Sequence, residues 1–154
     1  MNTDSLHFEI LISALPDVVY NTMIDDAGYK KWTSVFNAAS HFRGSWHKGS
    51  KMLFVGCDAE GNEAGMVSSI KENISGKFIS IEHIGELKGN EEILDGPTVE
   101  TWKGSLENYS FETVQGNTLL KIDMIGGVTA YADYFNATWP KALEKLKEIC
   151  ESKV

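Results

Sequence analysis

The chain is poor in cysteine and has no long apolar run, and both absences narrow its class. Its two cysteines, Cys57 and Cys150, lack the Cys-x-x-Cys spacing of metal and redox sites, so we expect reduced, buried thiols. A membrane span needs about 18 consecutive apolar residues, and the sequence contains no such run. Its start, MNTDSLHFEIL, lacks the basic residues of a secretion signal. We therefore expect a soluble, cytoplasmic protein with no membrane partner.

Positive charge is also scarce. The sequence contains 14 Lys and Arg residues against 22 Asp and Glu, which gives a formal net charge of -8. The lysines are scattered, whereas nucleic-acid-binding proteins gather positive charge into a patch or stripe, so we expect no nucleic-acid partner. Arg43 is the only arginine. We interpret it as an exposed strand residue, with a ligand-carboxylate role as the less favoured alternative.

Motifs for nucleophilic, phosphate-transfer and metal chemistry are missing. The sequence shows no Ser-His-Asp order, no glycine-rich phosphate loop and no evident pair of inward-facing carboxylates. His7, His41 and His47 lack the carboxylate or cysteine spacing of a metal site, and we interpret them as exposed. No catalytic residue, metal ligand or cofactor is therefore assigned.

The hydrophobic pattern that is present predicts one α+β domain. Residues 1–154, 42% of them hydrophobic, suffice for a single core. Residues 6–13 alternate between apolar and polar, which predicts a strand, and Pro16 suits the first turn of a helix. A second short helix follows Gly28. Residues 40–126 consist of alternating segments between turn residues, which brings the predicted antiparallel sheet to about seven strands.

Two segments of this region are less regular. In residues 99–112, VETWKGSLENYSFE, Trp102 and Tyr109 have opposite parity, so a bulge near residues 107–108 would place both on one face. Residues 86–98, ELKGNEEILDGPT, are acidic and contain glycine. We interpret them as a loop, with a lid over a cavity as the less favoured alternative.

The segment YADYFNATWPKALEKLKEIC, residues 131–150, has the period of an amphipathic helix with one buried face. Pro140 falls on the solvent side, where water can satisfy the carbonyl group that the ring leaves without a donor, and it bends the helix toward its apolar face. The aromatic residues of the segment all precede this proline: Tyr131, Tyr134, Phe135 and Trp139. We hypothesise that these rings cover a cavity mouth.

Three stretches carry a resemblance to known proteins: GSWHKGSKMLF (44–54), GNTLLKIDM (116–124) and YFNATWPKALEKLKE (134–148). With the order of elements, they resemble the START-like helix-grip superfamily (SRPBCC), and more narrowly its bacterial branch similar to the C-terminal domain of heat-shock-chaperone ATPase activators. These motifs are structural and specify no chemistry. The resemblance implies a curved sheet wrapped around the C-terminal helix and a deep apolar cavity, often used for lipids, steroids or polyketides.

Aromatic and methionine side chains are the candidates for the cavity lining, because ligand pockets are mostly apolar, although several of them could simply fill the core. His83 shares the parity of inward-facing isoleucines and could serve as a general base or polar anchor. A core or rim histidine bonded to backbone or water is the favoured alternative. The predicted ligand-binding residues are Trp32, Phe36, Phe54, Met66, His83, Trp102, Met124, Tyr131, Phe135 and Trp139.

Three functions remain open at this point. The first is binding of a small hydrophobic molecule, with a stress-related role as one option. The second is an enzyme of the polyketide cyclase or dehydratase kind, in which His83 or a tyrosine moves protons. The third is a domain that binds a chaperone or another protein partner, or forms a weak homodimer. The chain lacks the separate N-terminal domain of the chaperone activators, so we do not expect chaperone stimulation.

Overall fold

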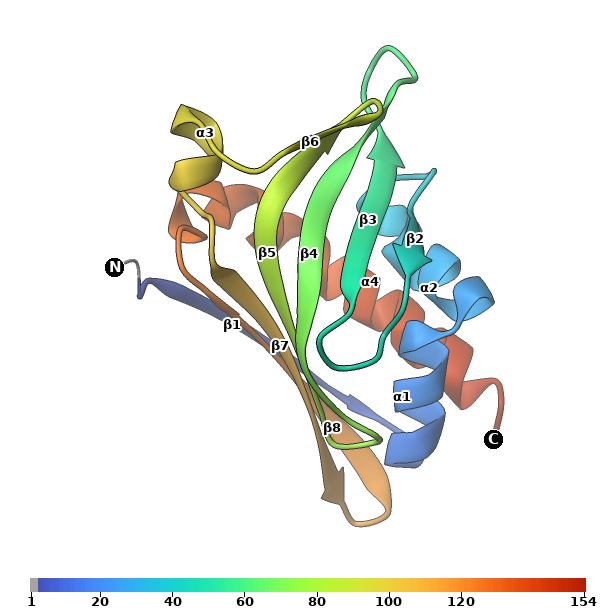
Figure 1. Cartoon of the computed structure of the whole chain (residues 1–154). Helices are drawn as coiled ribbons and strands as arrows, with labels where there is room; N and C mark the ends of the chain where they lie inside the picture. Colours follow the sequence, from blue (N-terminus) through green and yellow to red (C-terminus); the bar gives the residue numbers. More distant parts are fainter. Residues whose placement is uncertain (1–2) are drawn as a thin grey trace.

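The computed structural model describes residues 3–154 as a curved antiparallel sheet that packs against helices (Figure 1). The strands are β1 (Ser5–Ile12), β2 (His41–Gly44), β3 (Lys51–Cys57), β4 (Glu63–Ile74), β5 (Phe78–Lys88), β6 (Glu91–Ile93), β7 (Ser105–Val114) and β8 (Asn117–Ile125). The helices are α1 (Pro16–Ile24), α2 (Asp26–Trp32), α3 (Pro97–Glu100) and α4 (Ala132–Glu151), with 3-10 turns η1 (Thr33–Val35) and η2 (Thr129–Tyr131). This architecture confirms the predicted α+β class, with two short helices after the first strand.

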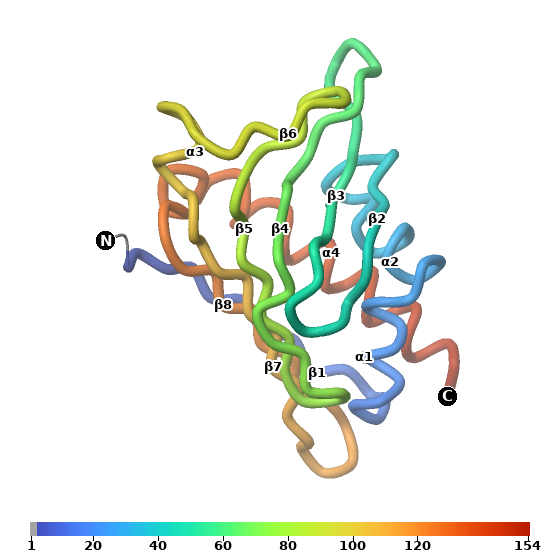
Figure 2. The backbone as a smooth tube through the Cα atoms, in the orientation of Figure 1, coloured from blue at the N-terminus to red at the C-terminus, as the bar shows by residue number. Residues whose placement is uncertain are grey.

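The sheet contains one strand more than the predicted seven. Its order is β1-β8-β7-β5-β4-β3-β2, and β6 pairs with β5. Residues 86–98 are therefore not a loop, because they include the end of β5, all of β6 and the start of α3. Figure 2 shows the chain doubling back after β5 to run beside it as β6. Ladder hydrogen bonds satisfy the backbone whatever the side-chain charge, so the acidic composition of this segment concealed a strand.

The predicted bulge in the following strand is also wrong. β7 pairs with β8 in unbroken register, from Leu106 opposite Ile125 to Val114 opposite Asn117. Trp102 lies in the turn between α3 and β7, so its parity imposes nothing on the strand. Irregular pairing occurs instead between β4 and β5, where bulges increase the local bend. In an unbroken β7, Glu107 faces the same side as the buried Tyr109.

The long helix α4 buries one face, as its sequence period predicts. Leu146 and Cys150 in its second half have no exposed surface, and Pro140 is exposed. Burial raises the pKa of the Cys150 thiol, which keeps it unreactive. Cys57 is exposed at the end of β3, so the expectation of two buried thiols is wrong for this residue. Within residues 3–154, no helix combines the length and apolar character that crossing a bilayer requires.

Asp4 fastens the segment before β1 to the turn that leads into α4. Its carboxylate accepts hydrogen bonds from the backbone N–H groups of Gly127 (2.8 Å), Val128 (2.9 Å) and Thr129 (2.8 Å), and from the Thr129 hydroxyl (2.9 Å). These bonds, with that of the Thr129 N–H foremost, lower the pKa of Asp4 from 3.8 to about 2. The start of α4 is thus held by a residue that precedes the whole sheet.

We expect Asp4→Asn to lower the melting temperature at neutral pH, because the amide replaces a charge that four donors stabilise. A depressed carboxyl pKa contributes stability above its unfolded value of 3.8, and this contribution is lost as pH falls through about 2. The difference in melting temperature between Asp4→Asn and wild type should therefore shrink as the pH falls from 3.8 to about 2, as measured by circular dichroism. Asp95→Asn, at an exposed position, is the control. A difference that stays constant down to the acid end of the window would contradict this role for Asp4.

Candidate ligand-binding cavity

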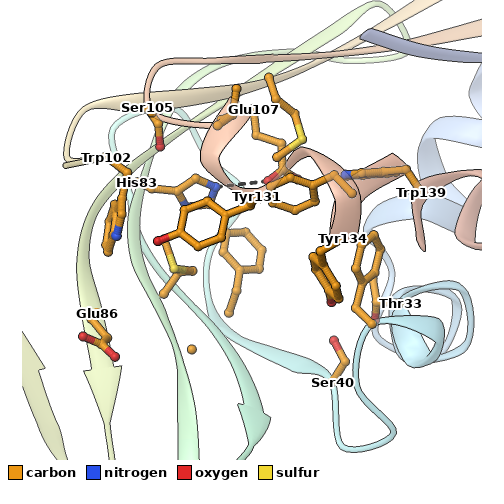
Figure 3. Close-up of a pocket in the computed structure, with 18 of the residues that line it drawn as sticks. Thr33, Ser40, His83, Glu86, Trp102, Ser105, Glu107, Tyr131, Tyr134 and Trp139 are labelled. Carbon is orange, nitrogen blue, oxygen red and sulfur yellow. Dashed lines mark hydrogen bonds and ion pairs between the residues drawn. The ribbon is translucent and has the colours of Figure 1, made fainter. Parts of the chain in front are cut away.

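A cavity of about 480 Å³ lies between the sheet and the first half of α4 (Figure 3). Its volume falls within the range of about 300–1,000 Å³ that is usual for small-molecule sites. We call the side chains that line it the cavity wall. The wall includes all ten residues singled out in the sequence: Trp32, Phe36, Phe54, Met66, His83, Trp102, Met124, Tyr131, Phe135 and Trp139. The structure thus brings these residues together, and their contact with a ligand stays a prediction.

Trp139 lies at the centre of the aromatic part of the wall. Its ring centroid is 5.1 Å from that of Phe36, 5.8 Å from that of Trp32, 6.1 Å from that of Phe8 and 6.2 Å from that of Tyr109. Among residues 3–154, no acceptor is available to its indole Nε1. Because four rings enclose it, Trp139 supports the roof of the cavity.

The hypothesis that the rings of Tyr131, Tyr134, Phe135 and Trp139 cover the mouth is therefore wrong for Trp139, which is only 2% exposed. Tyr131 and Tyr134 are 45% and 50% exposed and do lie at the surface. The aromatic half of α4 thus runs from exposed rings at its start to a buried ring beside Pro140. The period of the sequence shows which face of a helix is buried. It does not show how deeply each residue of that face is buried, because this depends on the elements that pack against it.

A polar network interrupts the apolar wall. His83 Nδ1 lies 2.7 Å from the Ser68 hydroxyl, and His83 Nε2 lies 3.1 Å from Glu107 Oε1. The Tyr109 hydroxyl donates to the other oxygen of Glu107. The register explains this assembly, because Ser68 lies opposite His83 on β4, and Ser105, two residues before Glu107, lies opposite His83 on β7. Three strands therefore point one polar row into the cavity side of the sheet.

The electrostatics of this network centre on Glu107. Burial, followed by the charge of Glu107, raises the pKa of Tyr109 well above its usual range. The same two causes in the same order raise the pKa of Tyr29. Both phenols consequently stay protonated at neutral pH and act as hydrogen-bond donors. A carboxylate that accepts a bond from Nε2 also fixes the His83 tautomer, with Nδ1 left to accept from Ser68.

Hydrogen bonds connect Ser68 to His83 and His83 to Glu107 in the order of a hydrolase triad. The serine cannot act as a nucleophile, however. Ser68 is fully buried at 0% exposure, so a substrate carbonyl has no path to its oxygen. The side chains of His83 and Glu107 are 12% and 17% exposed and belong to the cavity wall. What the arrangement can do is hold a polar group of a ligand, or move a proton to or from it.

Sequence reasoning missed the carboxylates of this site. Glu86 and Glu107 both line the cavity, although no inward pair was expected. Strand parity was the available signal, because Glu107 precedes the apolar Tyr109 by two positions, and the assumed bulge obscured it. His83 bonds to side chains instead of backbone or water, unlike the favoured interpretation.

The less favoured role of Arg43 finds no support in the geometry. The guanidinium is exposed and forms an ion pair with Glu63 at 2.5 Å, away from the cavity wall. Within residues 3–154, no cluster of three or more His, Cys, Asp or Glu side chains could hold a metal ion.

Comparisons with known proteins give the fold. No family model and no curated protein matches the chain. The Aha1 dimer from Colwellia psychrerythraea is 23% identical, with a TM-score of 0.71 over 96% of each chain. An AHSA1-like protein from Aeromonas hydrophila is 12% identical, with a TM-score of 0.71 over 97% of this chain and 94% of that one.

CalU16 from Micromonospora echinospora is 14% identical, with a TM-score of 0.66 over 94% of this chain and 73% of that one. Likeness at these identities concerns the path of the backbone and carries no function with it. It agrees with the resemblance drawn from the three sequence stretches. The chain therefore has the helix-grip fold.

Proposed function

We propose that the chain binds a small, largely hydrophobic molecule in the cavity beneath α4. The observation that carries this proposal is the cavity itself, about 480 Å³ with a wall in which about half of the residues are Phe, Tyr or Trp. Ligand pockets are concave and mostly apolar with a few placed polar groups, and this cavity has that composition, so it is best explained by an occupant. Each 100 Å² of apolar ligand surface removed from water would contribute about 2.5 kcal/mol, which favours ligands with extended apolar surface.

A second function, acid–base catalysis on the bound molecule, is favoured by the His83–Glu107 pair. The imidazole and the carboxylate are hydrogen-bonded to each other and both line the cavity. Cyclisation and dehydration of polyketide-like substrates require proton transfer at a positioned carbonyl or hydroxyl group. Conversion of the bound molecule separates the two functions, because a ligand that is only bound can also carry such a group.

A protein partner is the third part of the proposal. The Aha1 protein from Colwellia psychrerythraea is a dimer, and by analogy we include a weak homodimer or another protein partner here. The exposed rings of Tyr131 and Tyr134 at the start of α4 would be available to such a contact. The chain would then combine an enclosed ligand with an aromatic contact surface beside the cavity.

Native mass spectrometry of freshly purified protein tests the binding proposal. We expect a bound small molecule in the wild type and its loss in Phe135→Arg, which puts a charged group into the apolar cavity. Asn136→Arg, at an exposed position on the same helix, is the matched control and should retain the bound mass. Protein free of any bound molecule when purified from its own cell extract would argue against a carrier. Equal loss in both variants would show that the wall residue is not involved.

A further inference from the structure

We propose that the ligand is a hydrophobic amine, positively charged at neutral pH, whose ammonium group is stabilised by the negative charges of Glu107 and Glu86. This inference rests on the proposed binding function and adds the charge of the occupant. Three observations support the inference. Carboxylates line the cavity, lysine and arginine side chains do not, and the carboxylate of Glu107 can accept a further hydrogen bond.

The cavity wall is acidic. Two carboxylates, Glu86 and Glu107, and one imidazole, His83, line it, and no lysine or arginine from the described residues 3–154 does so. Carboxylates thus outnumber the groups of the wall that can carry a positive charge.

Two nearby basic side chains are occupied elsewhere. Arg43 forms its ion pair with Glu63 on the outside of the sheet. Lys103, just after Trp102 of the wall, donates to the Leu94 carbonyl oxygen at 2.5 Å. A ligand carboxylate or phosphate would thus enter a low-dielectric space next to like charges, with no lysine or arginine in the wall to pair with, which is unfavourable. The same field attracts a cation.

Glu107 retains capacity for a further donor. It accepts one bond from His83 and one from Tyr109, and a carboxylate has about four lone-pair positions. The two bound donors also hold the carboxylate in place before a ligand arrives, which lowers the ordering cost of binding. Glu86, further along the wall, forms no ion pair within the described part of the chain. Figure 3 shows the two carboxylates on either side of Trp102 and His83.

Ring faces complete a site suited to an ammonium group. Trp102 and Tyr131 lie beside His83 in Figure 3, and the Phe54 ring is 6.3 Å from that of His83. Aromatic faces attract cations, and most strongly when water is excluded. Carboxylates together with rings favour a hydrophobic amine over a fatty acid of the same size.

Three probes that share one apolar body test this assignment by titration calorimetry at neutral pH: 2-naphthylmethylamine, 2-naphthylmethanol and 2-naphthoate. We expect the amine to bind at least about tenfold more tightly than the carboxylate, with the neutral alcohol between them. Glu107→Gln and Glu86→Gln should each weaken amine binding by about three- to tenfold and leave the alcohol unchanged. Glu82→Gln, on the opposite face of β5 from His83, is the matched control and should change nothing.

The outcomes separate this inference from the binding proposal. Equal affinity for all three probes, or tighter binding of the carboxylate, would overturn the amine assignment and leave hydrophobic binding supported. Binding of none of them would count against both. Circular dichroism shows whether Glu107→Gln keeps the wild-type fold. If it does not, Glu86→Gln decides the matter, since Glu86 forms no ion pair with any residue of the described range 3–154.

Discussion

Trp139→Ala should lower the free energy of unfolding by about 3–5 kcal/mol, the usual cost of truncating a buried large aromatic residue. Trp139 is 2% exposed and touches rings from β1, α2, β7 and the segment after η1. The void left behind would merge with a cavity that is already about 480 Å³. Neighbouring side chains can therefore collapse into it only in part, which places the expected loss at the upper end of the range. Native domains have only about 5–15 kcal/mol in total.

Urea unfolding followed by far-ultraviolet circular dichroism measures this loss. Tyr134→Ala on the same helix is the control, because that ring is 50% exposed and its removal should cost less than about 1 kcal/mol. Trp139→Phe should fall between the two, since it keeps a ring and removes an indole N–H that has no acceptor within residues 3–154. Similar losses for Trp139→Ala and Tyr134→Ala would show that Trp139 is not central to the packing.

Gly127→Ala should lower the free energy of unfolding by about 2–5 kcal/mol through two separate effects. Gly127 has φ +69°, a left-handed conformation that alanine adopts at a cost. A Cβ atom at this position would also lie 2.4 Å from the Thr101 carbonyl oxygen and 2.9 Å from the Trp102 Cα. The link from β8 to α4 would have to move away from the turn after α3, which carries one of the rings of the cavity wall.

Gly116→Ala is the control that separates the steric cost from the conformational cost of the Gly127 substitution. Gly116 has φ +82°, and a Cβ atom there would meet nothing within 4 Å. It should therefore lose only the conformational term, about 1 kcal/mol. The difference between the two variants in chemical denaturation reports the contact between the β8–α4 link and Thr101. Indistinguishable losses would mean that this close approach does not constrain the cavity edge.

The order of elements was predictable because the hydrophobic periods are unambiguous where one face is buried. Leu143, Leu146 and Cys150 follow the helical period and are buried in α4, and the alternation in residues 6–13 corresponds to β1. These signals are local, so a sequence reveals them. The membership of the cavity wall followed from the resemblance to helix-grip proteins together with these faces.

The polar part of the site was not predictable, because it depends on contacts between residues distant in sequence. The register that sets Ser105 of β7 opposite His83 of β5 brings Glu107 to the histidine, and nothing near either residue announces it. Trp102 was assigned to a strand because α3 is too short to show a helical period. Strand β6 was missed because its stability comes from pairing with β5, and residues 86–98 have little strand propensity of their own.

The concentration of indole rings around the cavity gives the protein its own optical reporter. Three of the four tryptophans, Trp32, Trp102 and Trp139, stand on the cavity wall. The fourth, Trp46, packs against the rings of two wall residues, Tyr29 and Phe54. Emission from the native chain therefore originates almost wholly at this one place, and an arriving molecule would alter its intensity or colour without any attached dye.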